Sequence, residues 1–285
     1  MDVTGQVPTQ QELVSAALGL GVLMLLVFSS AQWITWIRDW LHGLDPWTGR
    51  PRAELAPPPV ADVPRFPLFL ALIWLGIHIP LLFTPRPEFD VAKLQPRLSG
   101  LVTEGIAILL LFVGLFAAEA KRGRDLHQYG LVPRGGVRAL INAGRGLIAA
   151  IAPVACVLLL TIPLRSEEQV HPLLLLLKAD SSFGTFALVL MIAAVLAPLN
   201  EELIFRVILQ STLLHVLPPQ WAIVLVALAF AAIHGLPDAL PLLPLALVLG
   251  YIYYRDRSFL TIVLVHALFN GLNVLLLLAG LEVAE

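Results

Sequence analysis

The chain has 285 residues, of which 58% are hydrophobic and 13% are charged, and its mean hydropathy is +0.86. A water-soluble surface cannot accommodate so many apolar side chains, so the composition excludes an ordinary soluble domain and predicts an integral membrane protein. The formal charge of -2, without a basic tail, disfavours a nucleic-acid partner. A single cysteine, Cys156, excludes an intramolecular disulfide and a cysteine-based zinc site.

Eight apolar segments follow one another along the chain. A helix that crosses the hydrocarbon core needs roughly 20 apolar residues, so each segment is a candidate membrane helix, although the sixth and seventh are short. We predict an all-α integral membrane protein with about eight transmembrane helices. The segments comprise residues 13–31, 66–84, 101–118, 146–163, 183–198, 221–234, 241–254 and 259–279.

Arginine and lysine concentrate in two connections, residues 33–65 and 121–145. The positive-inside tendency predicts that both connections are cytoplasmic, and the two spans between them agree with this parity. Arg255 and Arg257 also fall on the cytoplasmic side if all eight segments cross. Both termini are then expected outside.

The first connection begins with three tryptophans, Trp33, Trp36 and Trp40, and continues as a proline-rich stretch. Tryptophan is enriched where a membrane meets water, so we interpret the three as interfacial anchors on a short helix. The proline-rich stretch that follows predicts a surface loop.

Polar residues interrupt the apolar half of the chain at three places. The first is NEELIFR, with Glu201, Glu202 and Arg206; the second is His234, at the end of FAAIH; the third is HALFN, with His266 and Asn270. Ionisable residues inside membrane segments are costly and usually functional. We therefore predict that the C-terminal helices form a polar cavity, with membrane helices and cytoplasmic loops over residues 1–145 and the core that carries the site over residues 146–285.

Helical geometry separates the two adjacent glutamates. Glu202 and Arg206 are four residues apart and share a face, whereas Glu201 is rotated by about 100° from Glu202. We predict that Glu202 and Arg206 form a supporting ion pair, which leaves Glu201 unpaired. Burial of an unpaired carboxylate raises its pKa toward the range of a general base near neutral pH. Glu201 is thus the candidate base.

His266 and Asn270 are also four residues apart, so an imidazole and an amide can point into one cavity. A carboxylate, two imidazoles and an amide donor are the groups needed to activate water and to stabilise an oxyanion. The sequence has no HExxH, no GxSxG and no paired intramembrane aspartates. We therefore expect peptide hydrolysis within the membrane, with Glu201, His234, His266 and Asn270 as the catalytic residues.

The motifs EELIFR, FAAIH and HALFN resemble, in order and spacing, the EExxxR, FxxxH and HxxxN motifs of the CAAX prenyl protease and bacteriocin-processing (Abi, CPBP) family of intramembrane proteases. The resemblance implies that Glu201 is a general base on a water that His234 helps to bind. It also implies that His266 and Asn270 form an oxyanion hole and that Glu202 and Arg206 are a structural pair. We predict no metal or other cofactor; if zinc is bound, its ligands would be Glu201, His234 and His266.

The expected partners are membrane lipids and a membrane-associated protein or peptide substrate, and the expected location is a bacterial inner membrane. Two other functions stay open at this point. One is a non-catalytic scaffold or bacteriocin-immunity protein that keeps the pocket for binding. The other is a proton-coupled transporter, in which Glu201 and the histidines would relay protons.

The predicted topology conflicts with the predicted site. It places Glu201 near the cytoplasmic end of the fifth span and His234 at the far end of a sixth span roughly 20 Å long, at about 1.5 Å per residue. Those residues could not meet. Either residues 200–217 lie within the bilayer, or the sixth segment starts deep and does not cross.

Overall fold

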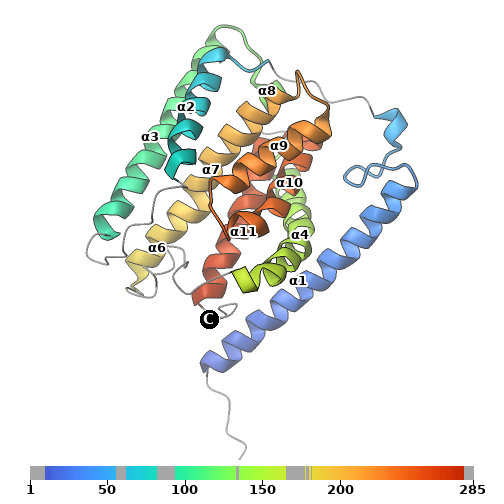
Figure 1. The fold of residues 1–285 in the computed structure, drawn as a ribbon, viewed down its shortest axis with the longest axis vertical. Helices are drawn as coiled ribbons and strands as arrows, with labels where there is room; N and C mark the ends of the chain where they lie inside the picture. Colours follow the sequence, from blue (N-terminus) through green and yellow to red (C-terminus); the bar gives the residue numbers. More distant parts are fainter. Residues whose placement is uncertain are drawn as a thin grey trace, which may run out of the picture.

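The computed structural model describes residues 10–55, 62–81, 94–132, 135–164, 177, 180 and 182–278, which form a helical bundle (Figure 1). This part of the chain contains no strand. The helices are α1 (Gln10–Leu41), α2 (Arg65–Leu81), α3 (Leu94–Lys121), α4 (Gly136–Thr161), α6 (Phe183–Met191), α7 (Ala197–Glu202), α8 (Ser211–Leu213), α9 (Pro219–Ala232), α10 (Ala239–Asp256) and α11 (Phe259–Leu278). Two segments, η6 (Ile192–Leu196) and η7 (Leu203–Gln210), are π-helical.

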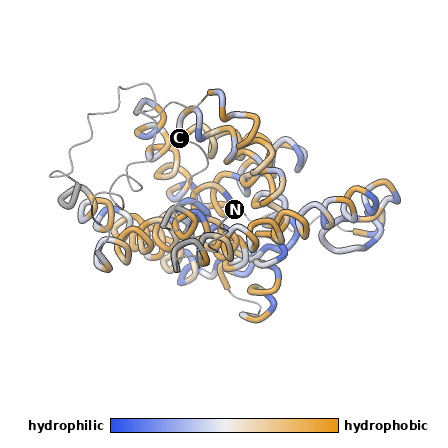
Figure 2. Tube along the Cα trace, turned by 90° about the horizontal axis from the view of Figure 1, so that it is seen from below, coloured by the Kyte–Doolittle hydropathy of each residue, from blue (hydrophilic) through white to orange (hydrophobic). Residues whose placement is uncertain are grey.

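Five helices are long and apolar enough to cross a membrane, in the part of the chain that the structure describes, rather than the eight predicted. All eight predicted segments contain a helix, but α2, α9 and α10 are not among these five, so the predicted number of about eight is not confirmed. Residues 82–84 and 279 of the predicted segments lie outside the described residues. The five comprise Ala16–Leu41, Leu98–Lys121, Gly136–Leu164, Phe183–Leu213 and Phe259–Leu276. Hydrophobic positions prevail along the helices (Figure 2).

One of these five helices resolves the conflict in the predicted topology. Residues 183–213 form a single helix through η6, α7 and η7, so the segment that begins at Asn200 continues the fifth span. Glu201 lies 12 residues from its Leu213 end, about 18 Å along the axis. A turn then leads into α9, which runs back for 14 residues, about 21 Å, and ends just before His234. The rings of Phe205 and Phe230 lie 5.2 Å apart. The geometry thus allows Glu201 and His234 to approach each other, in agreement with the first of the two alternatives, whereas the depth of residues 200–217 in a bilayer stays a prediction.

The basic connections meet at one end of the bundle. Arg124 pairs with Asp62 at 3.2 Å, and the hydroxyl of Tyr129 donates to the Asp62 carbonyl. Arg255, after the seventh segment, pairs with Asp45 of the first connection at 2.7 Å. The predicted parity thus agrees with the structure, whereas the assignment of this end to the cytoplasm stays a prediction.

Helix α4 packs against α1, α10 and α11 and lies near the centre of the bundle. The boundary predicted after residue 145 falls inside this helix, and the division of the chain into two parts stays a prediction. The long helix Phe183–Leu213, which carries both glutamates, packs through η7 against α9 and α2. Through η6 and α7 it packs against α11. This arrangement holds the three motifs on adjoining helices.

Gly146 of α4 lies close to side chains of α10 and α11. A Cβ atom on Gly146 would lie 2.5 Å from Val265 Cγ2 and 2.7 Å from Ile252 Cδ1. Because β-branched side chains have little freedom to move, Gly146→Ala is expected to lower the free energy of unfolding by about 1–3 kcal/mol. Gly144→Ala, two residues earlier, is the matched control, because a Cβ atom there meets nothing within 4 Å. Thermal unfolding in detergent measures both, and equal losses would contradict the close packing.

Candidate active site

A buried ion pair forms the centre of the site. Arg206 Nη1 donates to Glu202 Oε1 at 3.1 Å, and both side chains are fully shielded from solvent. Arg206 Nη2 donates to the Ala246 carbonyl of α10 at 3.2 Å, and its guanidinium lies 4.6 Å from the Phe230 ring centroid. The predicted pair is present, and Arg206 also links the long helix to α9 and α10.

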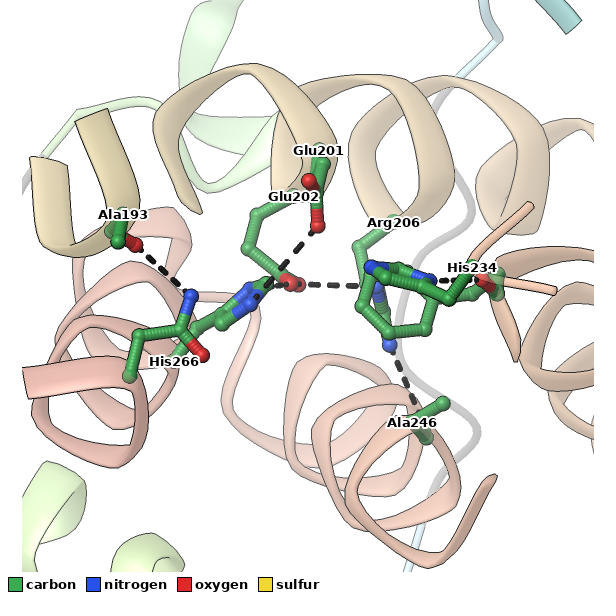
Figure 3. A network of polar contacts seen from close by, with 9 residues as sticks. Ala193, Glu201, Glu202, Arg206, His234, Ala246 and His266 are labelled. Carbon is green, nitrogen blue, oxygen red and sulfur yellow. Dashed lines mark hydrogen bonds and ion pairs between the residues drawn. The ribbon is translucent and has the colours of Figure 1, made fainter. Parts of the chain in front are cut away.

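His266 of α11 bridges the two glutamates (Figure 3). Its Nδ1 lies 2.8 Å from Glu202 Oε1, the oxygen that also accepts from Arg206. An ionised carboxylate can only accept hydrogen bonds, so Nδ1 must carry the proton and donate it to Glu202. The opposite ring nitrogen, Nε2, is thereby directed toward Glu201. Glu202 thus orients His266 in addition to pairing with Arg206, a role that the sequence alone did not reveal.

Glu201 lies on the other side of this imidazole. Its Oε2 is 3.8 Å from His266 Nε2, and it accepts no hydrogen bond from the described residues although the atom is shielded from solvent. A neutral His266 would present a lone pair to a carboxylate, which is an unfavourable contact of two acceptors. A second proton on the His266 ring, at Nε2, would remove this conflict and would bring the formal charge of the two glutamates, Arg206 and His266 to zero.

His234 follows the end of α9. Its Nδ1 lies 2.8 Å from the Phe230 carbonyl, which can only accept, so Nδ1 carries a proton. In the neutral ring Nε2 is then an acceptor for the hydrogen of a water. The Phe230 ring lies 4.9 Å from the His234 ring and 5.7 Å from that of His266. Phe230 therefore packs between the two histidines and the Arg206 guanidinium, so the aromatic position of FAAIH has a packing function.

Asn270 has a different contact from the one expected of an oxyanion donor. Its Nδ2 donates to the Ala193 carbonyl of η6 at 2.8 Å, which ties α11 to the first π-helical segment. A single N–H bond of the amide remains for another acceptor. Asn273, three residues further along α11, is exposed. In this conformation Asn270 ties α11 to the helix Phe183–Leu213 at Ala193, eight residues before Glu201.

The predicted zinc ligands do not form a metal-binding group. Across the described residues, no three or more His, Cys, Asp or Glu side chains are arranged to hold a metal ion. Glu201 and His266 approach each other, but His266 uses Nδ1 for Glu202. We therefore derive no step through a metal.

Comparison with known families agrees with these motifs. Residues 183–272, which are 90 of the 285 residues, match the family model described as type II CAAX prenyl endopeptidase, Rce1-like. All three motifs lie within the matched region, so the predicted resemblance is confirmed there. No curated protein and no solved structure is significantly similar to the chain. The family match supports a peptidase embedded in a membrane.

Proposed function

We propose that this protein is an intramembrane endopeptidase that hydrolyses a peptide bond of a membrane-associated protein through water activated by Glu201. The observation that carries the proposal is the shielded Glu201 Oε2, which has no hydrogen bond and faces His266 Nε2 at 3.8 Å. A shielded carboxylate that accepts no hydrogen bond from the described residues is a suitable general base. The match to the CAAX endopeptidase family gives the reaction class.

In the proposed mechanism, a water donates hydrogen bonds to Glu201 and to Nε2 of His234. Glu201 takes a proton as the water oxygen attacks the scissile carbonyl, and the proton then passes to the leaving amine. His266 stabilises the oxyanion while its Nε2 carries a proton, because only the protonated nitrogen can donate. The free N–H of Asn270 is the second candidate donor. The mechanism uses no cofactor.

The proposed substrate carries a lipid near its cleavage site. Glu201 lies about 18 Å from the nearer end of a membrane-crossing helix, so a substrate must bring its peptide bond to that depth. A prenyl group, as the name of the matched family suggests, would partition there. We propose the inner membrane of a bacterium as the location.

Comparing peptide termini in membranes from cells that produce the wild type or Glu201→Ala tests the proposal. We expect a small set of new C-termini to depend on Glu201. Candidate peptides from that set, with and without a farnesyl group, then show whether the lipid is required. An identical set of termini at equal protein abundance would favour a non-catalytic scaffold or immunity protein and contradict the peptidase.

A further inference from the structure

A second polar site lies at the basic end of the bundle. A cavity of about 520 Å³ opens between the last turns of α1, the connection that follows it, and α4. Its lining includes Trp36, Trp47, Asp39 and Arg145 and shares no residue with the catalytic network. The volume is in the range of small-ligand pockets.

Arg145 is an unneutralised cation in the lining of this cavity. It belongs to the membrane-crossing helix Gly136–Leu164, its guanidinium lies 4.6 Å from the Trp47 ring centroid, and one Nη2 donates to the Trp47 carbonyl. Across the described residues no carboxylate pairs with it. Arg145 is exposed, so its guanidinium is accessible to a ligand. The guanidinium fork, beside the Trp47 indole, matches a phosphate group.

Asp39 supplies the opposite charge in the same cavity. Among the described residues, the Asp39 carboxylate pairs only with Arg38, at 3.0 Å, and the Arg38 side chain is itself 64% exposed. Such exposed pairs are weak, so Asp39 can accept a hydrogen bond from a ligand ammonium. One cation, from α4, and one anion, from α1, therefore line the same cavity. This charge pattern complements a zwitterion.

The position of the cavity indicates that its ligand also has an apolar part. Tryptophans mark the level at which a membrane meets water, and Trp33, Trp36 and Trp47 form successive edge-to-face contacts beside the cavity. Phe28 and Met24 continue the cavity-lining stripe of α1 at four-residue steps from Gln32, and both are more than half exposed. A ligand whose head fills the cavity can lay an apolar chain along them.

We infer that this cavity binds the headgroup of a glycerophospholipid with a primary amine, of the phosphatidylethanolamine class. Arg145 holds the phosphate, Asp39 accepts from the ammonium, and the acyl chains follow Phe28 and Met24. The inference does not depend on the proposed peptidase activity.

Native mass spectrometry of the delipidated protein, titrated with lipids of identical acyl chains, tests this site. We expect phosphatidylethanolamine to bind more tightly than phosphatidylcholine or phosphatidylglycerol. Arg145→Gln should weaken all three roughly tenfold or more, because it removes the phosphate partner. Asp39→Asn should reduce the affinity for phosphatidylethanolamine to that for phosphatidylcholine, whose ammonium has no N–H to donate.

Two further variants separate the site from general effects. Thr35→Trp fills the cavity while both charges remain, and should also lower phosphatidylethanolamine binding. Thr35 lines the cavity, and its hydroxyl donates to the Gln32 carbonyl within α1. Arg50→Gln, an exposed basic residue of the adjoining connection outside the lining, should leave binding unchanged. Equal binding of the three lipids to the wild type, or unchanged binding in Arg145→Gln and Thr35→Trp, would overturn the inference. If phosphoethanolamine, which has no acyl chains, bound as tightly as phosphatidylethanolamine, the ligand would be a soluble phosphate compound and not a lipid.

Discussion

Replacing Glu201 by glutamine is expected to lower the rate of peptide cleavage by roughly 10²–10⁴, the contribution of a general base. The change keeps the size of the side chain but removes the group that takes the proton from water. Thermal unfolding should remain close to that of the wild type, because Glu201 Oε2 accepts no hydrogen bond from the described residues. Cleavage of a substrate peptide by equal amounts of folded protein measures the effect.

Glu202→Gln is the matched comparison, one residue along the same helix. Glu202 accepts from both Arg206 and His266, so its loss leaves the Arg206 cation without its carboxylate and releases the His266 ring. We expect lower stability together with lower activity. If Glu201→Gln destabilised the protein more than Glu202→Gln, the assignment of the two glutamates would be reversed.

Arg206→Met is expected to give the largest loss of stability, about 3–5 kcal/mol, because it leaves a buried carboxylate without its cation. Methionine retains much of the packing volume against Phe230. The loss of the hydrogen bond to the Ala246 carbonyl adds to the effect, since this bond joins the long helix to α10. Unfolding in detergent, followed by circular dichroism, gives the measurement.

A double variant and a surface variant control this prediction. Arg206→Met with Glu202→Gln removes both charges and should recover part of the stability. Arg138→Met removes an exposed arginine that lies 4.0 Å from Asp256 and should change stability little. A loss in Arg206→Met no greater than in Arg138→Met would show that the buried pair does not hold the helices together.

Local contacts in this site were predictable, and contacts between helices were not. The spacing of Glu202 and Arg206 determines that they share a helical face, because four residues make about one turn. The bridge from Glu202 to His266 joins positions 64 residues apart, and no local spacing encodes it. The contact of Asn270 with Ala193 depends likewise on how α11 crosses η6.

Every predicted apolar segment contains a helix, whereas the predicted number of about eight crossings is not confirmed, because α2, α9 and α10 are not among the five helices long and apolar enough to cross. Between residues 183 and 213 the charges of NEELIFR were interpreted as the end of a span, although the helix continues to Leu213. Burial of Glu202 with Arg206 makes these charges compatible with a continuous helix, as does the shielding of Glu201. No sequence pattern predicted the two π-helical segments, η6 and η7, that precede and follow α7.

A single turnover in H₂¹⁸O with enzyme in excess distinguishes activation of water by Glu201 from direct attack of Glu201 on the substrate. We expect one ¹⁸O atom in the new carboxyl group of the cleaved peptide and none in the enzyme fragment that contains Glu201. Appearance of ¹⁸O in the Glu201 side chain would indicate a covalent acyl intermediate on that residue and would contradict its role as a general base.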